Sequence, residues 1–217
     1  MPLFEGFSPD VLDNLGRQMT VRQHPQNQTI ILQDDWGSSV YFVVEGWVKI
    51  RTYNIDGKEV TLNILGPGEV VGEMAALDES PRSTDVISLT EAKVALLPAK
   101  KFVDFLEADS ACGVRLAQLI SRRLRQINRR LQLRESGSNA RVVDILLFLA
   151  EFRGRVSRAG VEIPNLPHRE LGSLSGLARE TVTRILGKLE TKGLIMRDRD
   201  RDIICIPSMD DLEDLLI

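Results

Sequence analysis

Cysteine, histidine and long apolar runs are scarce in this chain of 217 residues. It has two cysteines, Cys112 and Cys205, which are far apart in sequence, and two histidines, His24 and His168. So few ligands exclude a disulfide framework and an iron–sulfur cluster, and they argue against a zinc or heme site. We therefore expect no bound metal, and we expect both cysteines to be ordinary buried or half-buried residues.

The sequence also lacks recognisable membrane segments and catalytic motifs. No apolar run reaches the roughly 20 residues that a membrane-spanning helix needs, and the start, MPLFEGFSPD, lacks the basic and apolar parts of a secretory leader. We find no nucleophile–base pair and no Walker loop, and the two histidines are too far apart for a metal-dependent cupin. We expect a cytoplasmic protein without catalytic residues.

Charge is strongly segregated, although the whole chain carries a net charge of only −3. Residues 1–109 hold 9 Lys/Arg against 17 Asp/Glu, residues 110–201 hold 19 against 9, and residues 202–217 hold none against 5. A basic central block of this kind can bind nucleic acid phosphates while the acidic parts keep the protein soluble.

The first of three predicted regions, residues 1–109, is rich in β-structure. Short apolar or alternating runs are separated by turn signals such as Glu45-Gly46, Asp56-Gly57 and Gly66-Pro67-Gly68, a spacing typical of a β-barrel or jelly roll. The six expected strands are 29–32, 39–44, 47–51, 60–65, 84–89 and 93–97. Because the helices follow the strands, the expected fold class is α+β.

The second region, residues 110–136, is predicted to be one long helix. Seven residues follow each other at intervals of four and three: Gly113, Ala117, Ile120, Leu124, Ile127, Leu131 and Arg134. This heptad seam predicts a parallel homodimer, in which Arg123, Asn128 and Arg130 would border the partner helix. Gly137-Ser138-Asn139 should break the helix and form a hinge before a helix at 140–152.

The third region, residues 137–217, contains the most informative segment, HRELGSLSGLARETVTRILGKLETKGLI. It predicts a helix over 167–174, a turn over 175–178 and a second helix from Arg179, followed by a hairpin that reads as a wing. The second helix has a predicted buried stripe of Val182, Ile185, Leu186 and Leu189. Arginine matches the O6/N7 acceptors of guanine and glutamate can accept from cytosine N4, so the other face can read base edges. The candidate base-reading residues are Arg179, Glu180, Thr183 and Arg184.

A second candidate site lies in the segment from Gly68 to Val86 of the barrel. Gly72 and Ala75 are small and permit a ligand to approach the backbone closely. Met74 lies between Glu73 and Ala75 in the same segment. Glu73 can accept from a ribose hydroxyl, Arg82 can neutralise a phosphate and Ser83 adds a donor.

These motifs resemble a known family. GEMAAL followed by PRST is similar to the phosphate-binding cassette of cyclic-nucleotide-binding domains, and with the long helix and RETVTR the chain resembles the cyclic-AMP receptor protein/FNR family of bacterial transcription regulators along nearly its whole length. The resemblance implies a nucleotide-binding jelly roll, a dimerisation helix and a winged helix-turn-helix. It also implies double-stranded DNA with TGTGA-like half-sites and RNA polymerase as partners, and it adds His168 and Arg169 to the DNA-binding residues.

The identity of the effector stays open at this stage. Family members that bind cyclic AMP hold the adenine with threonine and serine hydroxyls on the long helix, and the matching residues here are Ile127 and Asn128. Arg82 and Asp85, in the order RSTD, resemble an element of cyclic di-GMP receptors, and Arg123 or Arg130 could read guanine. We expect cyclic di-GMP slightly ahead of cyclic AMP. The alternative is a ligand-independent regulator that a protein partner controls.

Overall fold

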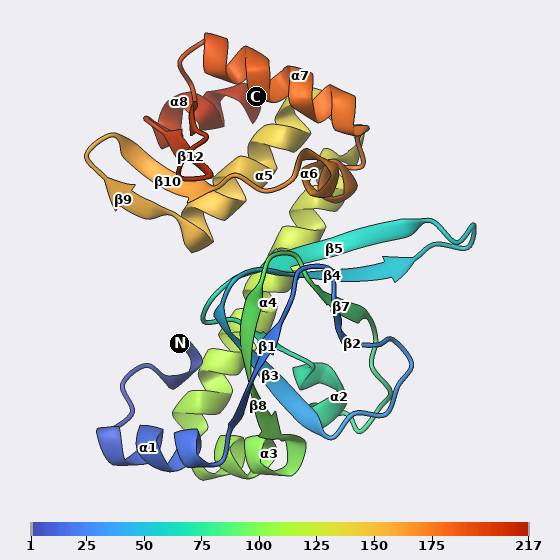
Figure 1. Cartoon of the computed structure of the whole chain (residues 1–217), viewed down its shortest axis with the longest axis vertical. Helices are drawn as coiled ribbons and strands as arrows, with labels where there is room; N and C mark the ends of the chain where they lie inside the picture. Colours follow the sequence, from blue (N-terminus) through green and yellow to red (C-terminus); the bar gives the residue numbers. More distant parts are fainter. Residues whose placement is uncertain (1, 217) are drawn as a thin grey trace. The chain divides into compact units, whose positions relative to one another are not determined.

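The computed structural model describes residues 2–216 and confirms the expected α+β class. The chain divides into two compact units, one ending at Leu124 and the other beginning at Arg125 (Figure 1). The division falls inside the long helix α4, Ser110–Gln132.

The first unit contains eight strands in two antiparallel four-stranded sheets. One sheet has the order β1-β8-β3-β6 and the other β2-β7-β4-β5. The strands are β1 (Thr20–His24), β2 (Thr29–Ile31), β3 (Ser39–Glu45), β4 (Val48–Tyr53), β5 (Glu59–Leu65), β6 (Val70–Val71), β7 (Asp85–Ser88) and β8 (Ala92–Pro98). All six predicted strands are confirmed to within two residues at each end, whereas β1 and β6 were not predicted.

The two sheets share a core. Alternate residues of β3 and β8, such as Val43 and Val94, pack with Val48 and Val86 of the second sheet. This is the period of two that a strand imposes, since successive side chains point to opposite faces. The sequence positions that alternate with them face the helices instead.

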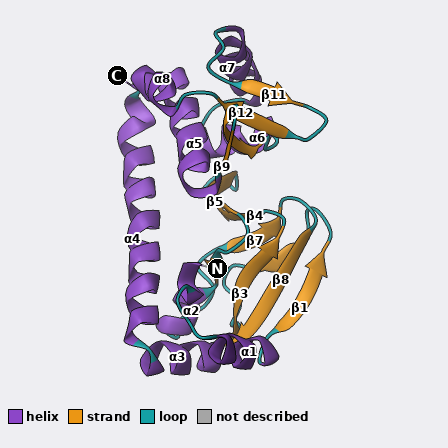
Figure 2. Ribbon diagram, turned by 90° about the vertical axis from the view of Figure 1, so that its left-hand side faces the viewer, coloured by secondary structure: helices purple, strands orange, loops and turns teal. Residues whose placement is uncertain are grey.

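The outer face of the first sheet is covered by helices. Val40 and Phe42 of β3 pack with Phe102 and Leu116, and the Phe4 ring lies 5.1 Å from the Phe42 ring. Figure 2 shows two of these helices, α1 and α3, side by side at one end of the strands. The helices of this unit are α1 (Pro9–Arg17), α2 (Glu73–Leu77), α3 (Ala99–Ala108) and the start of α4, with a short 3-10 turn η1 (Pro2–Phe4).

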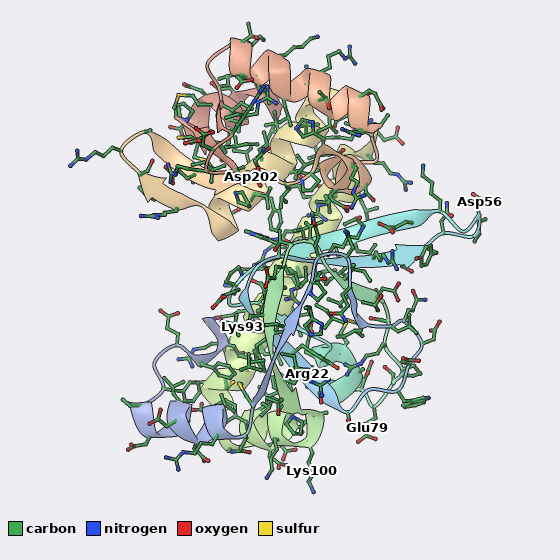
Figure 3. All side chains as sticks on the ribbon, in the orientation of Figure 1. Arg22, Asp56, Glu79, Lys93, Lys100 and Asp202 are labelled. Carbon is green, nitrogen blue, oxygen red and sulfur yellow. The ribbon has the colours of Figure 1, made fainter. Side chains whose placement is uncertain are left out.

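The β4–β5 hairpin ends in a tight turn with Asp56 at its tip (Figure 3). The side-chain oxygen of Asn54 accepts the backbone N–H groups of Asp56 at 3.1 Å and Lys58 at 2.8 Å, so the turn is locked by its own sequence.

The long helix matches its prediction closely, because α4 and the 3-10 turn η2 (Leu133–Glu135) together span 110–135. The seam residues Ile120, Leu124, Ile127 and Leu131 are between 39% and 57% exposed in the single chain. The predicted break is too long. Gly137 caps the next helix with extended backbone, and Ser138 and Asn139 already belong to its first turn, where short polar residues are favourable.

The second unit is a small antiparallel sheet of order β11-β12-β10-β9 with helices packed around it. The predicted helix-turn-helix is confirmed as α6 (His168–Ser175) and α7 (Arg179–Thr191), and the turn between them uses a left-handed Gly176. All four residues of the predicted stripe on α7 are buried. The remaining elements are α5 (Ser138–Arg153), β9 (Arg155–Ser157), β10 (Gly160–Pro164), β11 (Met196–Asp198), β12 (Ile203–Ile206), α8 (Met209–Glu213) and the 3-10 turn η3 (Asp214–Leu216).

Candidate effector site and DNA-binding surface

Arg82 occupies a cradle that two glycines make possible. Its side chain lies so close to Gly37 and Gly72 that a Cβ would come within 2.2 Å and 2.5 Å of guanidinium nitrogens, and Gly72 also has a left-handed φ of 77°. The guanidinium donates to the carbonyl of Gly72 at 2.7 Å and to that of Ser39 at 2.6 Å, and it lies over the Tyr41 ring. Arg82 is therefore held in one place by backbone.

The charge of Arg82 is buried and acts on the Glu73 carboxylate without a direct ion pair. The residue is 3% exposed, and it makes no ion pair with any side chain that the structure describes. An unpaired buried charge costs several kcal/mol, roughly, unless something compensates it. Two carbonyls accept from two of the five N–H groups of the guanidinium.

Glu73, the first residue of α2, is joined to the long helix. Its carboxylate accepts from Arg123 at 2.8 Å, and Arg123 also donates to Glu69 at 2.6 Å and to the Val70 carbonyl at 2.6 Å. Burial raises the pKa of Glu73, and the positive charges of Arg123 and Arg82 offset this only in part. We call the set Arg123, Glu73, Glu69 and the Val70 carbonyl the helix clamp.

The remaining cassette residues lie within α2 or next to it. Ala75 is buried, whereas Met74 is 53% exposed and its sulfur lies 3.9 Å from the Ser83 hydroxyl. The loop that carries Glu79 then leads from α2 to Arg82 (Figure 3). The structure thus brings Gly72, Glu73, Met74, Ala75, Arg82 and Ser83 together around one short helix.

Asp85 corrects the interpretation of RSTD as a ligand-binding pair. Its carboxylate accepts from the Gln33 backbone N–H at 2.8 Å and from Arg51 at 3.0 Å, and the residue is 3% exposed. Because Asp85 lies three positions from Arg82 where the chain enters a strand, its side chain turns to another set of neighbours. We remove Asp85 from the candidate effector site.

Arg130 requires a similar correction. Within the second unit its guanidinium lies 5.4 Å from the centre of the Phe148 ring, in a hollow of about 160 Å³ that Asp144 also lines. Burial lowers the pKa of Arg130, and Asp144 partly restores it. Arg130 therefore packs on α5. Asn128 is exposed on α4.

Three residues of the effector site were not recognised in the sequence. Gly37 and Ser39 supply the floor and one carbonyl of the Arg82 cradle, and Glu69 supplies the second carboxylate of the helix clamp. The turn signal Asp34-Asp35-Trp36-Gly37 was visible, but its link to Arg82 depends on backbone hydrogen bonds between positions about 47 residues apart, from Asp34 N–H to Arg82 and from Arg82 N–H to Asp35, each at 2.9 Å.

The candidate DNA-binding residues lie together on the helix-turn-helix. Arg179, Glu180, Thr183 and Arg184 are all exposed on α7. Pro167, His168 and Arg169 at the start of α6 line a hollow of about 400 Å³ together with Arg179. Two helix starts and two arginines in one hollow suit an anion such as a backbone phosphate.

The comparisons with known proteins match both domains of the chain. Residues 21–109 match the cyclic nucleotide-binding domain, and residues 140–215 match the Crp-like helix-turn-helix domain. The cyclic AMP receptor protein of Thermus thermophilus is 32% identical over 196 residues, which is 89% of this chain and 88% of that protein. The chain belongs to the CRP/FNR family of transcription regulators.

Other relatives extend this result. A CRP-like cAMP-activated global transcriptional regulator of Mycobacterium tuberculosis is 27% identical over 92% of this chain and 93% of that protein. The structure of FixK2 from Bradyrhizobium japonicum shares the fold, with a TM-score of 0.77 and 23% identity over 91% of this chain and 96% of that one. This CRP-family protein is thus a DNA-binding transcription regulator with a cyclic nucleotide-binding domain.

The described part of this CRP-family chain contains no group of three or more His, Cys, Asp or Glu side chains that could hold a metal ion. Burial raises the pKa of Cys112 to about 11, so this thiol stays protonated at neutral pH. No helix among residues 2–216 is long and apolar enough to cross a membrane.

We expect Asp85 to stabilise the fold. Asp85→Ala should lower the free energy of unfolding by about 1–3 kcal/mol, because it leaves the half-buried Gln33 N–H without this acceptor and removes a partner of Arg51. Asp56→Ala, at the exposed hairpin tip, should change it by less than about 0.5 kcal/mol. Urea unfolding without nucleotide measures both values, and equal stabilities for the two variants would contradict this role.

Proposed function

We propose that this protein is a homodimeric regulator whose affinity for DNA is controlled by a cyclic mononucleotide, with cyclic AMP as the first candidate. The observation that carries the proposal is the buried, unpaired guanidinium of Arg82. A protein keeps such a charge at a cost, and a bound phosphate would offset that cost.

The chemistry around Arg82 suits one phosphate and one ribose. Arg82 has N–H donors beyond the two that carbonyl oxygens accept, and the Glu73 carboxylate, at the start of α2, can accept from a ribose hydroxyl. A cyclic dinucleotide carries two phosphates. It would need further cationic and carboxylate side chains to bind the second half of the ligand. Asp85 and Arg130, the candidates for this role, contact other residues of the protein.

Cyclic AMP also draws support from the relatives. The Thermus thermophilus protein is named a cyclic AMP receptor protein, and the mycobacterial one is named cAMP-activated. At the helix positions where family members that bind cyclic AMP hold the adenine, this chain has Ile127, which offers no polar atom, and Asn128, whose amide can both donate and accept. The missing hydroxyls predict weaker binding of adenine than a threonine–serine pair would give.

The helix clamp supports a route from the nucleotide to the long helix. A ribose hydroxyl that donates to Glu73 competes with Arg123 for the same carboxylate, and Arg123 is part of α4. Binding therefore changes the partners of α4 at this position. The second unit, with the DNA-binding helices, begins on the same helix.

The dimer rests on the seam of α4. Four large apolar side chains repeat along one face of this helix and are at least 39% exposed in the single chain. A second copy of the helix would bury them, and the heptad spacing suits a parallel pair. Two recognition helices would then address two half-sites about one helical turn of DNA apart.

A ligand-independent regulator is the second candidate. The observation that favours it is that both key side chains already have partners: Glu73 accepts from Arg123, and Arg82 donates to two carbonyls. In either case we place the protein in the cytoplasm, with DNA and RNA polymerase as its working partners and with no catalytic activity.

The first prediction concerns the effector. The wild type should bind cyclic AMP with micromolar or tighter affinity, and Arg82→Ala should abolish binding because the phosphate loses its counterion. Arg22→Ala, an exposed arginine of β1, should bind as the wild type does. Calorimetric titration with cyclic AMP and with cyclic di-GMP measures both. Binding of cyclic di-GMP but not of cyclic AMP would overturn the choice of effector. If neither nucleotide bound, the ligand-independent regulator would be favoured.

A second prediction concerns base recognition. Arg179→Ala should cost about 1–3 kcal/mol on a palindrome of TGTGA-like half-sites and should relax the preference at one guanine. Arg158→Ala changes another exposed arginine, on the β9–β10 turn, and should leave the preference intact. Fluorescence anisotropy at fixed salt with specific and scrambled duplexes gives the affinity ratio. An unchanged ratio for Arg179→Ala would rule out its role in reading bases.

A third prediction concerns the dimer. Leu124→Glu should be largely monomeric and weak on DNA, because the seam would bury a carboxylate without a partner. Val156→Glu, at an 84% exposed residue of β9, provides the matched control and should stay dimeric. Sedimentation equilibrium distinguishes the two. A stable dimer of the Leu124→Glu variant would show that this seam is not the interface.

A further inference from the structure

A histidine is hydrogen-bonded to the recognition helix. His168 is the first residue of α6, and its Nδ1 lies 2.7 Å from the hydroxyl oxygen of Thr183 on α7. That hydroxyl lies 3.0 Å from the backbone carbonyl of Arg179, one turn earlier in α7. The three groups form a chain from the imidazole to the start of the recognition helix.

The direction of this chain fixes the tautomer of the imidazole. A threonine hydroxyl has one proton, and the Arg179 carbonyl can only accept it. The hydroxyl must therefore accept the proton of His168 at Nδ1. In a neutral imidazole this leaves a lone pair at Nε2. Among the described residues, the hydrogen bond of the His168 ring is the one at Nδ1.

The surroundings of His168 are basic. Burial lowers its pKa below the ordinary value, and the positive charges of Arg197 on β11 and Arg179 on α7 lower it further. Arg197 is itself paired with Glu190 of α7, and Arg169, the next residue of α6, is bonded to Glu170 at 3.0 Å. The hollow beside His168 is lined by Pro167, Arg169 and Arg179 and has no carboxylate in its lining.

An anion in this hollow would favour the protonated form of the His168 imidazole over the neutral one. A phosphate brings negative charge next to Nε2, where a lone pair would repel it and an N–H would donate to it. Protonation at Nε2 leaves the Nδ1–Thr183–Arg179 chain unchanged, because Nδ1 already carries its proton. The protonated ring can therefore bind the phosphate without rearranging the recognition helix.

We propose that His168 takes up a proton when the protein binds DNA, so that its Nε2–H donates to a backbone phosphate and the affinity for DNA increases as the pH falls. This inference rests on the proposed DNA-binding function and adds a regulation of the same surface. In the free protein, burial and the charges of Arg197 and Arg179 lower the pKa of His168, and the phosphate would raise it in the complex. Between the pKa of His168 in the complex and its pKa in the free protein, the association constant for DNA should therefore rise by at most about tenfold for each unit by which the pH falls.

The direct test is calorimetry of the full-length protein, with excess cyclic AMP, on a duplex of two TGTGA half-sites. Titrations at one pH in buffers of different ionisation enthalpy give the number of protons taken up. The wild type should take up a fraction of one proton, and His168→Gln, which can still hydrogen bond but cannot titrate, should take up none. His24→Gln changes the other histidine, which lies on β1 and is bonded to Gln28, and should behave as the wild type does.

A second measurement does not depend on the variants. NMR titration of the two histidine ring signals in the wild type should show a higher pKa for His168 in the DNA complex than in the free protein. Equal proton uptake by wild type and His168→Gln, or an unshifted His168 signal, would overturn this inference while leaving DNA recognition intact. Failure of the wild type to prefer this duplex over a scrambled one at every pH would overturn the proposed function and this inference together.

Discussion

The ion pairs of Arg123 are the constraint on which the proposed mechanism depends. One guanidinium on α4 is held by Glu73, Glu69 and the Val70 carbonyl, all in or beside the cassette, at 2.6–2.8 Å. Its side chain is 15% exposed, so solvent screens these contacts only weakly. Because Glu73 is also the carboxylate suited to a ribose, a nucleotide on Arg82 would act on the long helix through a group that the helix already uses.

Much of the fold could be predicted from the sequence because its periodicities are strong. The heptad positions of α4 and the buried stripe of α7 repeat as a helix requires, and alternation marks strands such as β3. Two strands were missed for clear reasons. β1, with the sequence TVRQH, is a largely exposed edge strand, and β6 has only two residues, Val70 and Val71. Neither leaves a pattern that can be recognised without its neighbours.

Residue type alone indicates Arg82 and Glu73 as candidate site residues, whereas the partners of Asp85 and Arg130 depend on the direction of their side chains. Arg82 and Glu73 lie at the centre of the cassette, as their chemistry suggested. The order RSTD predicts Asp85 beside Arg82, but its partner is Arg51 of β4, 34 positions away, which no local motif could indicate. Arg130 is one of several arginines on the long helix in the sequence, and in the structure it packs over Phe148. Such pairings depend on tertiary contacts between distant segments.

The most direct test of the central claim is the effect of cyclic AMP on DNA affinity in the variant Arg123→Gln. Arg82 is intact in this variant, so cyclic AMP should still bind, and calorimetry on the same samples measures this. If the helix clamp couples the two sites, the increase in DNA affinity that cyclic AMP produces in the wild type, about 5–150-fold for typical allosteric coupling, should be largely lost. An unchanged increase in Arg123→Gln would show that the signal reaches the DNA-binding helices without the clamp.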